Sequence, residues 1–162
     1  MKYALAGHHH DNNAPNDWLR KVTTPDIELL LPARAENIAV VRHALGALGD
    51  AFAIDGQTLA DIRLAVTEAC TNVVVHAYPA DVEGPLEMDA SVQWPSLVVV
   101  VRDRGGGISP RASSPGLGLG LPLIASLADS VELRRGGGDG TAVRMVFDLG
   151  EADGSGGNGA SP

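Results

Sequence analysis

Residues 96–103 read Ser-Leu-Val-Val-Val-Val-Arg-Asp, and this stretch restricts the possible folds more than any other. Four consecutive valines favour a strand over a helix, because branching at Cβ restricts the side chain against the preceding helical turn. A strand that lacks polar alternation suits burial on both faces. Residues 86–93 alternate between apolar and polar types, as in a half-exposed strand. We therefore expect a sheet that contains the valine run as a fully buried strand.

The remaining patterns alternate between helical and extended periods. Apolar residues recur at intervals of three and four in two long stretches, which is the period of an amphipathic helix. The predicted elements are, in chain order, a strand at 26–33, a helix at about 33–52, a helix from about 57 to 78, strands at 86–93 and 96–103, a helix at 117–127, and a hairpin of 130–135 with 141–149. This order predicts an α+β fold: a two-layer sandwich with a mixed, mostly antiparallel sheet of about five strands and three main helices on one face.

Length and composition indicate one globular domain. The chain has 162 residues, of which 44% are hydrophobic and 20% charged, and this is enough for a single well-filled core. Residues 1–21 lack a hydrophobic period, and residues 150–162 have the Gly/Ser-rich composition of a flexible linker. We therefore expect an ordered domain at 22–149 between two disordered ends.

Charge and cysteine content exclude several classes of function. The formal net charge is −8 and no basic run is present, which argues against direct binding to nucleic acid. Backbone amides can still bind a small anion locally. Cys70 is the single cysteine, so it cannot form an intrachain disulfide, and we expect a small buried apolar side chain. No signal peptide or membrane-spanning apolar run is visible, which predicts a cytoplasmic protein without membrane contact.

A row of three polar side chains interrupts the second long helical stretch. Glu68, Asn72 and His76 are four residues apart, so they lie on one helix face beside the apolar stripe. A solvated flank of the helix would explain each of them alone. The neighbours of this polar row are Ala and Val instead of other charged residues. Such a row also suits a cleft at the edge of the core, so these three residues form a candidate site.

The second candidate segment is Asp103-Arg-Gly-Gly-Gly, which directly follows the buried strand. A carboxylate held at a strand end can accept a hydrogen bond from an exocyclic amine, such as that of adenine. Gly105 and Gly107 would let a flat base or the backbone approach closely. Turns of this composition are also common for structural reasons, so the segment alone is a weak signal.

The third candidate segment holds Gly116, Gly118 and Gly120, which alternate with leucines where the last predicted helix begins. Free amides and the helix dipole can form an anion site there, and glycine lets phosphates come near. A glycine-rich turn with a purely structural role explains the segment equally well. The segment lacks the lysine of a P-loop and follows no parallel βαβ unit, so neither the P-loop nor the Rossmann pattern fits. Gly140 and Thr141 open the last predicted strand and by themselves indicate only a hairpin.

In their order and spacing, these four segments resemble the boxes of the Bergerat-type (GHKL) ATP-binding fold, which histidine kinases, gyrase and mismatch-repair ATPases share. The likeness is greatest to the small anti-sigma-factor serine/threonine kinases of bacteria. Residues 68–78 (EACTNVVVHAY) look like the N box of that family, 103–108 (DRGGGI) like its first glycine box, 116–121 (GLGLGL) like its second and 140–143 (GTAV) like its third. The resemblance covers about residues 26–149.

The resemblance implies ATP and Mg2+ as cofactors and a role for each matched residue. Glu68 would be the general base that takes the proton from a serine hydroxyl, and Asn72 would coordinate Mg2+. Asp103 would accept a hydrogen bond from the adenine amino group, with Thr141 in support. The glycines would make room for the nucleotide: Gly105 and Gly107 for the base and ribose, and Gly116, Gly118 and Gly120 for the phosphates.

The implied function is that of an ATP-dependent protein serine/threonine kinase that sequesters a sigma factor and phosphorylates an anti-anti-sigma antagonist. Such kinases form homodimers, and the first strand and helix offer a candidate surface here. Only residues 108–115 separate the first two glycine boxes, so the lid over the phosphates is short. We expect low phosphate affinity, low turnover or dependence on a partner protein. The alternative is a non-catalytic, nucleotide-sensing binding module of the same fold. Retention of both Glu68 and Asn72 favours the kinase.

Overall fold

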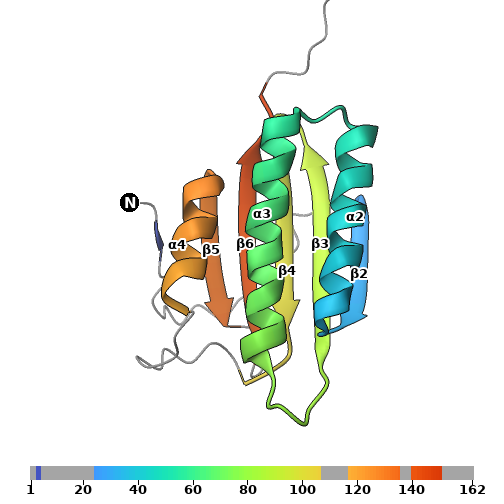
Figure 1. Cartoon of the computed structure of the whole chain (residues 1–162). Helices are drawn as coiled ribbons and strands as arrows, with labels where there is room; N and C mark the ends of the chain where they lie inside the picture. The colour runs from blue at the N-terminus through green and yellow to red at the C-terminus, as the bar shows by residue number, and fades with distance from the viewer. Residues whose placement is uncertain (1–2, 5–23, 107–116, 136–139, 151–162) are drawn as a thin grey trace, which may run out of the picture.

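The computed structural model describes residues 3–4, 24–106, 117–135 and 140–150, which form two layers (Figure 1). One layer is a sheet. The other consists of α2 (Ala35–Ala51), α3 (Gly56–Asn72) and α4 (Leu117–Leu127), all on the same face of the sheet (Figure 1). Within these described ranges, no helix has the length and apolar character needed to cross a bilayer. The predicted α+β sandwich is confirmed.

The sheet has the strand order β1-β5-β6-β4-β3-β2. The strands are β1 (Tyr3–Ala4), β2 (Ile27–Pro32), β3 (Pro85–Gln93), β4 (Ser96–Asp103), β5 (Ser130–Arg135) and β6 (Thr141–Asp148). Neighbouring strands are antiparallel except β1 and β5, which run parallel. The sheet is therefore mixed and mostly antiparallel, and its longer strands are those expected from the sequence.

Strand β1 lies within the segment 1–21, for which the sequence predicts disorder. It consists of Tyr3 and Ala4 alone, which pair with Val131 and Glu132 of β5. Residues 5–23 and 151–162 lie outside the described part of the chain. The boundaries of the ordered domain stay a prediction.

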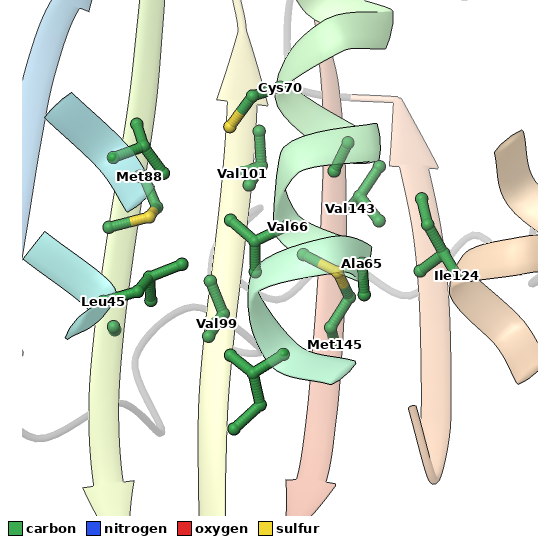
Figure 2. Close-up of a cluster of buried hydrophobic side chains, with 14 of the residues drawn as sticks. Leu45, Ala65, Val66, Cys70, Met88, Val99, Val101, Ile124, Val143 and Met145 are labelled. Carbon is green, nitrogen blue, oxygen red and sulfur yellow. The ribbon is translucent and has the colours of Figure 1, made fainter. Parts of the chain in front are cut away.

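Strand β4 is buried on both faces, as the valine run predicts. Leu97, Val99 and Val101 belong to the main apolar core beneath the helices. Figure 2 shows this core, with side chains of α2 and α3 pointing towards β4 and its neighbours. Val98 and Val100 point to the opposite face and are only 5% and 2% exposed. The residue that ends this strand is therefore held by a rigid backbone.

Helix α3 begins at a capping residue and ends in an altered turn. The carboxylate of Asp55 accepts a hydrogen bond from the backbone N–H of Thr58 (2.9 Å), which caps the helix and lowers the pKa of Asp55. Beyond Asn72 the chain continues as a five-residue π-helix, η1 (Val73–Ala77), and becomes extended at Tyr78. The predicted end near Tyr78 is confirmed, but apolar periodicity does not predict the wider winding. Single turns of this kind are frequent at functional sites.

Cys70 supplies a test of the packing beneath α3. Its side chain is fully buried, as the sequence predicts, and burial raises the pKa of the thiol to about 12. Because the thiolate is the reactive form, we expect no reaction of the folded protein with an aromatic disulfide reagent at about pH 8. Unfolding in denaturant should then release one thiol per chain, measured by absorbance. Prompt reaction of the folded protein would contradict this burial.

Candidate functional site

Glu68 and Asn72 lie one turn apart on α3 and meet the first half of α4. Asn72 is 8% exposed, and Glu68 is half-buried. A Cβ added at Gly120 of α4 would come within 2.5 Å of Glu68 Oε1 and 3.0 Å of Asn72 Nδ2. No larger residue fits at position 120 without displacing the carboxylate. The fold thus brings Gly120 to an acid and an amide that lie about 50 residues earlier in the sequence.

The end of the same helix reaches the first glycine segment. The carbonyl oxygen of Ala77, the last residue of η1, accepts a hydrogen bond from the backbone N–H of Gly106 (3.2 Å). A Cβ at Gly105 would overlap that carbonyl, whereas a Cβ at Gly106 would meet nothing within 4 Å. Close backbone approach therefore requires glycine at position 105, and packing within the described residues does not require it at position 106.

Asp103 ends β4 and is 7% exposed. Its Oδ1 accepts hydrogen bonds from the backbone N–H groups of Gly105 (2.9 Å) and Thr141 (3.2 Å). Burial raises the pKa of this carboxyl above its ordinary value, and hydrogen bonds from Gly105 and Thr141 oppose the rise. The carboxylate is thus oriented by backbone donors and partly desolvated, which strengthens any further hydrogen bond made to it.

The start of β6 passes close to the same carboxylate. A Cβ at Gly140 would overlap the carbonyl of Asp103 and lie 3.0 Å from the Cα of Arg104. Glycine at this position therefore lets Thr141 reach Asp103. The resemblance predicts this support of Asp103 by Thr141. Sequence reasoning treats Gly140 as a hairpin residue and does not select it for the site. The signal that could have found it is the Gly-Thr pair in the third box.

Tyr78 is a second residue that sequence reasoning did not select. Its hydroxyl accepts a hydrogen bond from the backbone N–H of Arg104 (2.8 Å), between Asp103 and Gly105. The one sequence signal for it is its position at the end of the segment that begins with Glu68. The third member of the predicted polar row, His76, lies half-buried on η1.

The other predicted glycines stay predictions. Gly107 and Gly116 lie outside the described residues, as does the short segment 108–115. Gly118 lies in the first turn of α4, where only the course of the backbone is described. Contacts of these glycines with a base, a ribose or phosphates are therefore untested.

The residues around Asn72 fit a magnesium ion held mainly by its substrate. Among the described residues, no three His, Cys, Asp or Glu side chains form a group that could hold a metal ion. Mg2+ is commonly bound through one or two protein ligands together with phosphate oxygens and water. The side-chain amide of Asn72, whose Nδ2 lies near Gly120, carries one such oxygen.

The two clusters lie along a single helix and its π-helical end. Glu68 and Asn72 form the first cluster, and Ala77, with Gly105 and Asp103 beyond it, marks the second. Ala77 follows Asn72 by five positions, which corresponds to about 7.5 Å along an α-helix axis. The two clusters are thus close enough for one extended ligand to contact both.

Known proteins resemble this chain in sequence. The chain matches the family model of the histidine kinase-like ATPase domain over residues 31–147. A serine-protein kinase RsbW from Bacillus licheniformis is 30% identical over 123 residues, covering 67% of this chain and 77% of that protein. An RsbW from Halalkalibacterium halodurans is 30% identical over 142 residues, covering 78% and 86%.

A solved structure shares the fold. The RsbU and RsbW domains of a Mycobacterium tuberculosis protein superpose with a TM-score of 0.60 at 24% identity, covering 77% of this chain and 33% of that chain. This likeness concerns the fold alone. The matched range spans the positions from Glu68 to Thr141. The chain therefore belongs to the family of histidine kinase-like ATPase domains, and it is similar in sequence to RsbW serine-protein kinases.

Proposed function

We propose that this protein is an ATP-dependent serine/threonine kinase and anti-sigma factor of the cytoplasm, which sequesters a sigma factor and phosphorylates its anti-anti-sigma antagonist. The observation that carries the proposal is the packing of Glu68 and Asn72 against Gly120. A carboxylate beside a metal-binding amide suits phosphate transfer to a hydroxyl. Family membership supports ATP as the nucleotide, and the RsbW relatives are named serine-protein kinases.

Each side chain has a separate part in the proposed reaction. Asp103 accepts a hydrogen bond from the adenine amino group and so selects the base. Asn72 gives one oxygen ligand to Mg2+, which, when bound, reduces the repulsion between the phosphates and an attacking oxygen. Glu68 takes the proton from the serine hydroxyl. Gly120, which has no Cβ, lets α4 lie directly against the acid and the amide.

The direct test is incubation with γ-labelled ATP, Mg2+ and a purified candidate antagonist. We expect label on a serine of the antagonist, and no label when Mg2+ is chelated. The short segment 108–115 favours a second candidate, a nucleotide-sensing binding module without catalysis. Nucleotide binding that changes affinity for a sigma factor, without label on any candidate antagonist, would favour that module over the kinase.

The proposed surface for a second copy of the chain is the edge strand β2. It pairs with β3 on one side, and among the described residues no strand lies on its other side. Ile27 and Leu29 are partly buried and pack against the core, whereas Leu30 is 67% exposed. A charge at position 27 or 29 would therefore damage the core, so Leu30→Lys is the suitable probe of this surface.

We expect the native protein to sediment as a dimer at micromolar concentration and Leu30→Lys to sediment as a monomer. Burial of an unpaired ammonium group across the two-fold axis would oppose pairing of the two edges. The affinity for ADP should stay within about twofold, since β2 lies at the far edge from α4 (Figure 1). The matched control is Leu123→Lys, at an exposed leucine of α4, which should leave the dimer intact. A native protein that is monomeric with and without ATP would contradict the proposal.

A further inference from the structure

The hydroxyl of Tyr78 joins two strands at the edge of the candidate base site. It donates a hydrogen bond to the carbonyl oxygen of Pro85 (2.6 Å), the first residue of β3. It accepts a hydrogen bond from the backbone N–H of Arg104 (2.8 Å), the first residue after β4. One hydroxyl therefore fixes the chain at the point where it leaves Asp103.

The ring that carries this hydroxyl is held in one position. A Cβ at Gly84 would overlap Cε1 and Cζ of the Tyr78 ring, so the ring lies directly against the backbone of Gly84. Burial, with a smaller effect from the nearby carboxylates of Asp103 and Glu87, raises the pKa of the phenol above its ordinary value. The hydroxyl therefore stays protonated at neutral pH and keeps donating to Pro85.

Two consecutive residues at the end of the helix hold the segment that follows β4. Ala77 accepts a hydrogen bond from Gly106, and Tyr78 accepts one from Arg104. Between these two points, the N–H of Gly105 donates to Asp103 Oδ1. The orientation of the Asp103 carboxylate thus depends on a backbone segment whose first amide is fixed by a tyrosine side chain.

We propose that Tyr78 is a positioning residue for base selection, which aims the Asp103 carboxylate at the exocyclic amine of adenine through the backbone of Arg104. This inference rests on the proposed binding of ATP. In this proposal Tyr78 does not contact the nucleotide. Its effect is confined to the base, because Glu68, Asn72 and Gly120 form a separate cluster with α4.

The test compares ADP with inosine diphosphate, which carries a carbonyl oxygen in place of the adenine amine. Calorimetry gives the Kd of each for the native protein and for Tyr78→Phe, which keeps the ring and removes the hydroxyl. We expect the Kd for ADP to rise about tenfold in Tyr78→Phe, the effect of one lost net hydrogen bond, and the Kd for inosine diphosphate to change less than about twofold. A merely structural role would leave the ratio of the two Kd values unchanged.

Two further variants make the test specific. Gly84→Ala keeps the hydroxyl but displaces the ring. Like Tyr78→Phe, it should raise the Kd for ADP more than the Kd for inosine diphosphate. Ser126→Ala removes a different hydroxyl, which donates to the carbonyl of Leu123 (2.7 Å), and it should leave both Kd values unchanged. Resistance of the buried Cys70 thiol to reagent shows that each variant is folded.

The failure of this inference differs from the failure of the proposed function. If the native protein prefers ADP and Tyr78→Phe keeps the same preference, Tyr78 does not position Asp103 and the inference is wrong. If the native protein binds neither diphosphate, the proposed nucleotide site itself is wrong, and the inference falls with it.

Discussion

Replacing Glu68 with Gln is expected to lower phosphate transfer to a serine by about 100- to 10,000-fold, the usual contribution of a general base. The amide has the size of the carboxylate, so it keeps the contact with Gly120 but cannot take a proton from the hydroxyl. Binding of ADP should change less than about twofold, because the base site at Asp103 is a separate cluster. Label transfer gives the rate, and calorimetry gives the Kd.

Two other substitutions separate chemistry from binding. Asn72→Ala should remove the part of nucleotide affinity that depends on Mg2+, which titrations with Mg2+ and with a chelator would measure. Asp61→Asn is the matched control, since Asp61 is another carboxylate of α3, where it accepts a hydrogen bond from Gln57 (3.0 Å). It should leave transfer and binding unchanged. Equal behaviour of the Glu68 and Asn72 variants would show that the proposed division of roles is wrong.

Replacing Asp103 with Asn is expected to weaken ADP binding by about 1–3 kcal/mol, or roughly 5- to 150-fold in Kd. The Asn oxygen can still accept from the backbone N–H groups of Gly105 and Thr141, so the local backbone is kept. The amide puts a donor where the carboxylate has its second acceptor, and this donor would face the adenine amine. Calorimetry with ADP measures the effect, and native affinity in the variant would contradict the base assignment.

The same substitution should not destabilise the nucleotide-free protein near pH 7. Folding raises the pKa of Asp103, mainly by burial, so the folded state holds this proton more tightly than the unfolded chain does. The contribution of this group to stability therefore falls as the pH rises from the unfolded pKa towards the folded one, and it is lowest at neutral pH. Asn carries no charge, so the variant avoids the free-energy cost of burying the ionised carboxylate at neutral pH. The thermal midpoint of the variant should therefore equal or exceed that of the native protein. A clear fall would show that the carboxylate stabilises the fold.

A pair of glycine substitutions checks the geometry around Asp103 independently. Gly105→Ala would drive a methyl group into the carbonyl of Ala77, whereas Gly106→Ala would meet open space. The first should weaken ADP binding and lower the thermal midpoint. Gly106→Ala is the matched control. It should leave the thermal midpoint unchanged, and it should leave the affinity for ADP unchanged unless the methyl group meets the nucleotide.

The elements and their order could be predicted because the signals are local. Periods of two and of about 3.6 residues distinguish strands from helices, and glycine runs mark the hairpin between β5 and β6. The valine run predicts a doubly buried β4, and the burial of Val98 and Val100 confirms it. The order and spacing of four polar and glycine-rich segments, read together, were enough to indicate the family.

The contacts between those segments depend on long-range packing, which no local pattern contains. The meeting of Gly120 with Glu68 follows from how α4 lies against α3, and that of Gly140 with Asp103 follows from how β6 pairs with β4. The π-helical turn at η1 likewise could not be predicted from the sequence, because the apolar spacing fits an α-helix up to Tyr78.

The direction in which a side chain points also depends on the tertiary structure. The sequence predicts a strand at 26–33, but its three consecutive leucines do not show which side faces the core. Only the tertiary structure decides that Ile27 and Leu29 face the core and Leu30 faces solvent. Likewise, the sequence places Tyr78 at the end of a helix, and only the tertiary structure brings its hydroxyl to Arg104 and Pro85. Periodicity along the chain determines which residues can share a face, whereas the pairing and packing of distant elements decide which atoms meet.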